Sequence, residues 1–428
     1  MAARIKVAAA VLPLLALLAC SGEDNGDSSK RSAALLEPPP KGEGVQLKMT
    51  SSLAAGTETE RCMFYQVGPE GLAVNHEDVR VTSGSHHILL FVTPYSGIPT
   101  QDRFGNSVDT SGIFECGSRG PTAHWEVTGV AGGSQIADGA PIINDLPAGT
   151  AIVIPPGTVL LMNTHYLNST GKEIETDARI NLHTIPAAEV TTEAGILFWY
   201  NPNIYIPAQQ AASAREVCPI RKDIQLVNAQ SHMHRRGVGY VARLLDASDS
   251  PLSELYRTTE WEDVEMDTFK PPKALTAGQK VDFQCDYQNT TDHTIFQGLS
   301  TKDEMCMFLG LYYPKDRQTE LCGLNAEWKG AFWGATWIGQ GAADGATTAA
   351  CLGATKDRSE DGGESFFKCV FDSCPTINTQ LSAAVRCLGT QGLGACGAQC
   401  STDAASCKTC IQTQCAEAVS TLSKATCT

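Results

Sequence analysis

The sequence predicts an all-β body of two antiparallel sandwiches in tandem, followed by a small disulfide-rich, helical module. Between about residues 46 and 335, short apolar or alternating runs are separated by clusters of Gly, Pro, Asn and Asp. Short strands at this density are typical of antiparallel sandwiches. Ten of the 17 cysteines follow residue 350, with Ala, Leu and Gln between them. That composition favours short helices held by about five disulfides.

The N-terminus is typical of an export signal. Arg4 and Lys6 precede an apolar run over residues 7–19, which is shorter than the roughly 20 residues that a membrane-spanning helix needs. The sequence LLAC, ending at Cys20, resembles the lipobox of bacterial lipoproteins, in which the cysteine is lipidated. The alternative is an ordinary cleaved signal with an incidental cysteine.

If Cys20 is lipidated, residues 1–19 are the signal peptide and residues 20–45 are a flexible tether rich in Ser, Asp, Lys and Pro. Ser21 stands where an aspartate often marks retention at the inner membrane. We therefore expect an exported protein, anchored by lipid at the outer membrane on its periplasmic or cell-surface side.

The composition indicates which cellular compartment and which classes of partner to expect. Without Cys20 the chain keeps 16 cysteines, an even number that indicates disulfides and an oxidising compartment. The formal net charge is −15, and no long basic run is present. Nucleic acid is therefore excluded as an expected partner.

The expected domain boundaries follow the changes in composition. Two β domains are predicted, over residues 46–192 and 193–330. A Gly- and Ala-rich linker is expected over residues 331–350, and the Cys-rich module over residues 351–428. Within this module Cys407 and Cys410 form a Cys-x-x-Cys motif, but no histidine accompanies it, so a disulfide scaffold is favoured over a zinc or redox site.

Histidines in strand-like segments are the strongest functional signal. His232 and His234 are two residues apart, so on a strand both imidazoles lie on one face and can bind one metal. Two exposed polar residues on a solvated face are the alternative. Met305 is a candidate third ligand, although Met307 lies on the same strand face and either methionine alone could be core filler.

A second group of histidines lies upstream. His86 and His87 are adjacent, so both can face one metal only at a strand end or a local irregularity such as a bulge. His165 lies in a separate strand-like segment. Imidazole suits copper, and a thioether suits Cu(I) in particular. The remaining histidines are interpreted as structural or surface residues: His76, His124, His183 and His293.

The ordered set HHILLF, THYLN, HMH followed by a glycine, and DEMC…YYP resembles the copper type II, ascorbate-dependent monooxygenases, the family of peptidylglycine α-hydroxylating monooxygenase and dopamine β-monooxygenase. The resemblance covers about residues 50–325. It implies two jelly-roll-like sandwiches, each with one copper, that face each other across a solvent-filled cleft.

The resemblance assigns two coppers per chain. His86, His87 and His165 would bind the electron-transfer copper, and the oxygen-activating, catalytic copper would be held by His232, His234 and Met305.

The resemblance also implies disulfides between Cys285 and Cys306 and between Cys218 and Cys322. Cys62 resembles a family cysteine whose usual partner is absent here, and its pairing with Cys116 follows by elimination.

The implied reaction is hydroxylation of a C–H bond of a small organic substrate by O2, with electrons from ascorbate or another one-electron donor. Gln230 replaces a substrate-binding arginine of the peptidylglycine enzyme, and Met307 and Leu309 replace two further contact residues. Asn163 stands where that enzyme has a glutamine proposed to lie on an electron route. We therefore expect a substrate other than a peptide C-terminus.

The alternative is an extracytoplasmic lipoprotein that binds copper without turnover, in which the Cys-rich tail serves as an adhesion or interaction module for a surface partner. A degenerate structural homologue is a third reading, and the presence of all six candidate ligands opposes it.

Overall fold

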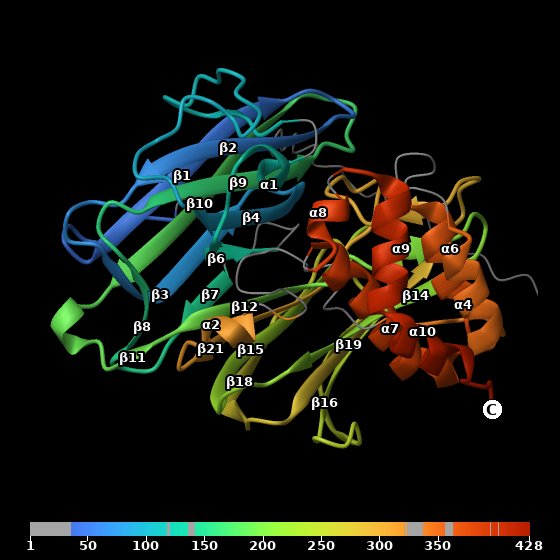
Figure 1. Cartoon of the computed structure of the whole chain (residues 1–428). Helices are drawn as coiled ribbons and strands as arrows, with labels where there is room; N and C mark the ends of the chain where they lie inside the picture. Colours follow the sequence, from blue (N-terminus) through green and yellow to red (C-terminus); the bar gives the residue numbers. More distant parts are fainter. Residues whose placement is uncertain are drawn as a thin grey trace, which may run out of the picture.

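The computed structural model describes residues 36–117, 120–135, 142–320, 322, 337–355, 363–393, 395–400 and 402–428. Figure 1 shows three neighbouring units in these residues: a first β unit, a second β unit, and a group of helices packed beside the second unit. A largely β protein with antiparallel sheets and a helical, disulfide-rich C-terminal region is therefore confirmed.

The first β unit consists of two sheets. In spatial order, the larger sheet contains β1 (Gly44–Leu53), β10 (Ile174–Thr184), β3 (Leu72–Val81), β8 (Thr150–Ile154) and β11 (Thr192–Glu193), with β7 (Ile142–Asp145) also paired to β3. The other sheet contains β5 (Phe114–Glu115), β2 (Glu58–Gln66), β9 (Val159–Leu167), β4 (Ser85–Val92) and β6 (Gly129–Ser134). All these strand pairs are antiparallel except β8 with β11.

The core of the first unit follows from alternation along its strands. On β3, Val79 and Val81 are buried whereas Asp78 and Arg80 lie on the other face, as a period of two requires. The buried residues of β3 pack in one cluster with those of β4, β9 and β10. Cys62 and Cys116 form a disulfide on the opposite side of the smaller sheet, within an aromatic cluster. Short helices α1 (Pro121–His124) and η2 (Ala187–Glu189) complete the unit.

The second β unit begins at Gly195 and also has two main sheets. One contains β12 (Gly195–Tyr200), β21 (Cys306–Tyr313), β15 (Ile224–Met233) and β18 (Asp267–Leu275). The other contains β14 (Ala211–Pro219), β19 (Lys280–Gln288), β16 (Gly237–Leu245) and β17 (Pro251–Thr258). β13 (Tyr205–Ile206) pairs with β20 (Ile295–Phe296), and α2 covers Arg317–Glu320.

Disulfides in the second unit join distant strands around its buried core. Cys285 on β19 bonds to Cys306 at the start of β21, and Cys218 on β14 bonds to Cys322. These pairs are the same as those that the resemblance implies. The Cys285–Cys306 bond fixes the backbone next to Met305.

The C-terminal module is a set of short helices: α4 (Gly345–Gly353), α6 (Glu364–Asp372), η3 (Pro375–Ile377), α7 (Asn378–Leu393), α8 (Gly397–Cys400), α9 (Ala404–Gln414) and α10 (Ala416–Ser423). Its ten cysteines form five disulfides: Cys351–Cys369, Cys374–Cys427, Cys387–Cys415, Cys396–Cys410 and Cys400–Cys407. Cys407 and Cys410 therefore bond to different partners and not to each other, which leaves no dithiol pair for redox or zinc chemistry at this motif.

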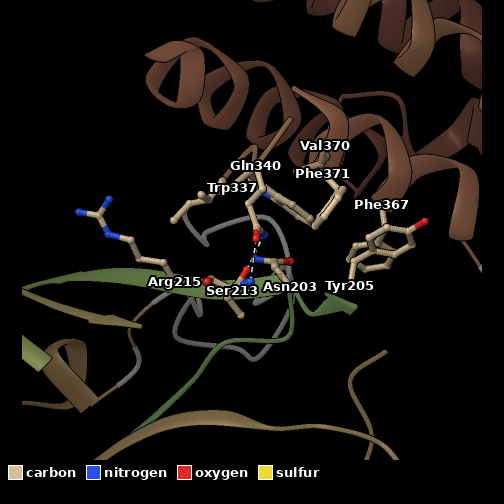
Figure 2. A pocket seen from close by; sticks show the side chains of 11 residues that line it. Asn203, Tyr205, Ser213, Arg215, Trp337, Gln340, Phe367, Val370 and Phe371 are labelled. Carbon is tan, nitrogen blue, oxygen red and sulfur yellow. Dashed lines mark hydrogen bonds between the residues drawn. The ribbon is translucent and has the colours of Figure 1, made fainter. Parts of the chain in front are cut away.

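The helical module packs directly on the second β unit. Figure 2 shows Gln340 reaching Ser213 on β14; its amide donates to the Ser213 carbonyl (2.6 Å), and its Oε1 accepts from the Ser213 N–H (2.7 Å). Tyr205 packs edge-on against Phe371 and parallel to Phe367. The cavity between them has a volume of only about 20 Å³, close to that of a single water.

Two segments expected to be flexible are ordered in part. Within the range 20–45, the Leu36 carbonyl accepts from Gln46 (2.9 Å) and the Glu37 carbonyl accepts from Asn181 (2.7 Å). Within the range 331–350, Trp337 is buried in the helical core and α4 already begins at Gly345. The described residues of these ranges, 36–45 and 337–350, therefore belong to the folded body.

Two leucines on β17 differ in burial, and this difference tests which face of the strand points into the core of the second unit. Leu255 is 4% exposed and lies in the core, whereas Leu252 on the same strand is 52% exposed. Leu255→Ala should lower the free energy of unfolding by about 2–5 kcal/mol because it leaves a cavity. Leu252→Ala, the matched control, should change it by less than about 0.5 kcal/mol. Denaturant unfolding measures both, and equal effects would contradict the assigned register.

Candidate metal centre

The first histidine group lies on two neighbouring strands of the smaller sheet of the first unit. His86 and His87 are near the start of β4, and His165 lies on β9, where it pairs directly with His87. The register between β4 and β9 shifts between Ser85 and His87. The irregularity expected from adjacent histidines is therefore present, and it allows both imidazoles to approach His165.

The second group lies at the end of β15. His232 pairs with Met307 of β21, Met233 pairs with Cys306, and His234 follows the last residue of the strand. The His234 N–H and the Arg236 N–H both donate to the buried carboxylate of Glu304 (3.0 and 2.8 Å). Glu304 thus holds the backbone of the His-x-His segment against the residue that precedes Met305. Burial raises the pKa of Glu304 to about 7 despite these hydrogen bonds.

The two groups meet in one cluster, and His86 belongs to both. The ligand nitrogens of His86, His87 and His165 lie within 4.8 Å of one another, and the same holds for His86, His232 and His234. The ring centroids of His86 and His232 are 4.8 Å apart. This contact corrects the expectation of two sites that face each other across a solvent-filled gap, because the rings of the two units touch.

Four of the five rings are largely shielded from water. His86, His165, His232 and His234 are at most 5% exposed, and the Trp261 ring lies 5.9 Å from the His86 ring. Burial, strengthened by the neighbouring imidazoles, lowers the pKa of His87 and of His234 to about 3. It also holds the pKa values of His86 and His232 well below their usual range. These rings are therefore neutral at pH 7, the state in which imidazole binds a metal.

Hydrogen bonds from the surroundings orient four of the five rings. His87 Nε2 donates to Asn163 Oδ1 (2.9 Å), and His165 Nε2 donates to Glu58 (2.8 Å). His234 Nδ1 donates to the Asp303 carbonyl (3.2 Å). His232 Nδ1 donates to the side chain of Gln135, which belongs to the first unit. Such outer partners fix the orientation of metal-binding histidines.

Glu58 connects the two units at the same place. Its carboxylate accepts from His165 and also from the N–H and hydroxyl of Thr301 in the second unit (3.2 and 3.0 Å). Burial would raise the pKa of Glu58, but these bonds outweigh burial and lower that pKa to about 2. Glu58 and Gln135 were not identified from the sequence. In the sequence each of them is just an acid or an amide in a strand-like segment. Many such residues lie at protein surfaces, so this pattern does not single out a metal site.

Several ring nitrogens of the cluster have no hydrogen-bond partner and could coordinate a metal. Both nitrogens of His86, Nδ1 of His87, Nδ1 of His165 and Nε2 of His234 are buried without a hydrogen-bond partner. A buried polar atom without a partner costs about 1–3 kcal/mol. Five such atoms at the centre of one cluster fit a metal-binding site, because coordination would satisfy them. The residues present therefore fit copper.

Both candidate methionines lie beside the second group. Met307 pairs with His232, so it lies on the histidine face of the sheet. Met305 directly precedes Cys306, the first residue of β21, and His234 directly follows Met233, which pairs with Cys306. Met305 is 9% exposed and Met307 is 2% exposed. The Met305 carbonyl accepts from the buried Tyr287 hydroxyl (2.6 Å). The backbone thus leaves two thioethers as candidates for one ligand position.

Residues expected to shape the substrate site also have defined partners. Gln230 donates to the Val264 carbonyl (2.7 Å), so its amide is occupied by the backbone. Asn163 donates to Glu60 (3.0 Å) while it accepts from His87. Cys20 lies outside the described residues.

Comparisons with curated protein sequences and with solved structures give little information about this chain. No curated protein sequence matches the chain. Among solved structures, the chain is similar to the major capsid protein P2 from Bacteriophage PM2, with 8% identity and a TM-score of 0.24 over 63% of this chain and 99% of that chain. It is also similar to the STIV MCP, with 9% identity and a TM-score of 0.29 over 64% of this chain and 96% of that chain. Likenesses this weak carry no argument.

The family match is more specific. Residues 192–332 match the model described as "Copper type II ascorbate-dependent monooxygenase, C-terminal domain". This range contains His232, His234 and Met305. The second β unit of this chain therefore matches the C-terminal domain of the copper type II ascorbate-dependent monooxygenases.

Proposed function

We propose that the protein is a copper-dependent monooxygenase that hydroxylates a C–H bond of a small organic substrate with O2 and an external one-electron reductant such as ascorbate. The observation that carries the proposal is the convergence of five histidines, four of them buried and four with an unpaired ring nitrogen, at a region that matches a domain of this copper family. The jelly-roll-like winding of both sandwiches belongs to the same proposal.

Two coppers per chain would be held by this cluster. His86, His87 and His165 would hold the electron-transfer copper, and His232, His234 and Met305 would hold the oxygen-activating copper. When bound, copper would supply electron storage and O2 activation, and a thioether ligand would favour the Cu(I) state.

The side chains of the protein would do three things around the metals. Asn163, Glu58 and Gln135 orient the imidazoles through their hydrogen bonds. The low exposure of the rings excludes water from the reacting region, which protects reactive chemistry from side reactions. The bonds of Glu58 to Thr301 hold the first unit against the loop that leads into Met305.

The surroundings favour a substrate that needs no carboxylate partner. Gln230 offers no positive charge, and its amide already donates to a backbone carbonyl. Arg236, the nearby cation of the His-x-His segment, is bound to the Lys302 carbonyl and lies 3.7 Å from Glu304. The lining contributed by Met307 and Leu309 is apolar.

The alternative function is binding of copper outside the cytoplasm without turnover, with the helical module as an interaction surface. The same histidine cluster would serve it. Product formation separates the two: with isotopically labelled O2, ascorbate and a panel of uncharged organic compounds, only a monooxygenase places one labelled oxygen atom in a product.

Eight disulfides indicate an oxidising, extracytoplasmic location. Within the part of the chain that the structure describes, no helix has the length and apolar character to cross a bilayer. Anchoring at the outer membrane through lipidated Cys20 is part of our proposal.

The shared position of His86 gives a prediction about copper content. The wild-type chain should retain about two coppers after reconstitution and desalting. His87→Ala should remove mainly one, because His87 lies only in the first group. His86→Ala should weaken both sites, because its ring lies in both groups. Elemental analysis measures this difference, and equal copper loss in the two variants would count against the shared position.

The two methionines give a prediction about activity. Met305→Ala should keep the first copper but reduce ascorbate-dependent hydroxylation at least about a hundredfold, because a metal ligand is lost. Met307→Ala, a matched control two residues away, should retain most of the activity. Hydroxylated product is quantified by mass spectrometry. The reverse ranking would move the ligand role to Met307.

The lipid anchor is tested separately. Cys20→Ala should move the protein from the membrane fraction to the soluble exported fraction, since the acyl chains that hold it would be absent. Immunoblots of fractionated cells show the outcome, with Ser21→Ala as the control. Unchanged fractionation would remove the anchor from the proposal without affecting the copper centre.

A further inference from the structure

A second cluster of possible metal ligands lies on the larger sheet of the first unit. It consists of His76 and Asp78 on β3, His183 on β10 and Asp145 on β7. These strands are adjacent, with β3 between β10 and β7. From the sequence alone, His76 and His183 are expected to be structural or surface residues, because the two are 107 positions apart in the chain and neither has a histidine neighbour.

The backbone brings these side chains together. His76 pairs directly with His183 on one side and with Asp145 on the other. Asp78 is two residues from His76 and therefore lies on the same face. The register of β10 with β3 shifts immediately after His183, so the pairing is irregular next to the cluster. Three strands thus present four side chains at one point of a hydrogen-bonded sheet, and little further ordering is needed to bind a ligand.

The distances are those of a compact coordination site. Ligand atoms of His76, Asp78 and His183 all lie within 4.8 Å of one another. Asp78 accepts from His76 Nε2 (2.7 Å) through one oxygen and from His183 Nε2 (2.8 Å) through the other. His76 Nδ1 hydrogen-bonds to Asp145. In this arrangement protons occupy the positions between donor atoms that a cation would otherwise fill.

Charge and exposure also suit a cation. The side chains of His76, Asp78 and His183 are 31%, 19% and 29% exposed, so the cluster is open to solvent on one side. Among the ion pairs of the described residues, Asp78 and Asp145 pair only with histidines, not with Lys or Arg. Asp78 in the ligand group and Asp145 beside it would together supply a charge of −2, which balances a divalent ion.

We propose that His76, Asp78 and His183 form a binding site for a divalent first-row transition metal such as Zn²⁺, separate from the histidine cluster between the two units. Asp145 would orient the His76 ring through its other nitrogen, Nδ1. Two imidazoles and one carboxylate, with a water as the fourth ligand, match a tetrahedral Zn²⁺ site. Binding would release the protons now held between the ligand atoms.

The site would connect to the contact between the β units. β7 also carries Asn144, whose Oδ1 accepts from Asn228 of the second unit (3.0 Å). Asn144 donates to the buried Glu77 next to His76 (3.2 Å). A metal bound by His76 would fix this ring, and the hydrogen bond from its Nδ1 to Asp145 would then hold β7 to β3 and keep Asn144 in place against β15. Its role is structural, and the proposal does not depend on the copper reaction.

Zinc content of the full chain tests the site. Wild type and variants are dialysed against Zn²⁺, and bound zinc is measured by elemental analysis. Asp78→Asn and His183→Ala should each bind one zinc fewer than wild type, with affinity lowered at least about tenfold. His293→Ala, which removes an exposed histidine beside Asp292, should match wild type. Zinc held at the other histidine cluster is common to these proteins and cancels in the comparison.

A second measurement needs no variant. His76 and His183 are partly exposed, so diethyl pyrocarbonate should modify both in the metal-free protein, and Zn²⁺ should protect both but not His293. Peptide mass spectrometry reads each residue separately. Unchanged zinc content in Asp78→Asn and His183→Ala, or equal modification of His76 and His183 with and without Zn²⁺, would overturn the proposal.

Discussion

Five imidazoles pack against one another in this protein, and several of their ring nitrogens have no hydrogen-bond partner. Each unpaired buried nitrogen opposes folding. Burial, strengthened by the neighbouring imidazoles, lowers the pKa values of His86, His87, His232 and His234 and keeps these four rings uncharged. Such a cluster is unfavourable as plain core, because apolar side chains would fill the same space at lower cost. It becomes favourable when a metal satisfies the nitrogens, which couples metal binding to the stability of the protein.

Strand pairing in the two β units holds the histidine cluster rigidly. In the first unit, β4 and β9 are directly paired, and one irregularity near the start of β4 brings His86 and His87 to the same side. In the second unit, β15 and β21 are directly paired, and the Cys285–Cys306 disulfide anchors β21 to the other sheet. Glu58 and Gln135 then join the two units by hydrogen bonds made at the cluster itself. Placement of the rings is therefore determined by strand pairing, which is more precise than placement on loops.

Much of the fold and of the histidine cluster could be predicted from the sequence, because these features depend on local sequence patterns. Alternation predicts the strands, the spacing of His232 and His234 predicts one shared face, and the adjacent His86 and His87 require an irregularity that the register shift provides. The contact of His86 with His232 could not be predicted, since it depends on how the two units pack. The same holds for the pairing of His76 with His183, which arises from strand register between distant segments.

Histidines from both β units form one continuous cluster, and we propose that this cluster holds copper. The decisive experiment is a crystal structure of the copper-loaded protein, with anomalous diffraction measured at the copper absorption edge. We expect anomalous peaks at the unpaired nitrogens of His86, His87, His165 and His234, with the His86 ring still against His232. Peaks located elsewhere, or a solvent-filled gap between His86 and His232, would show that the cluster is not the copper site.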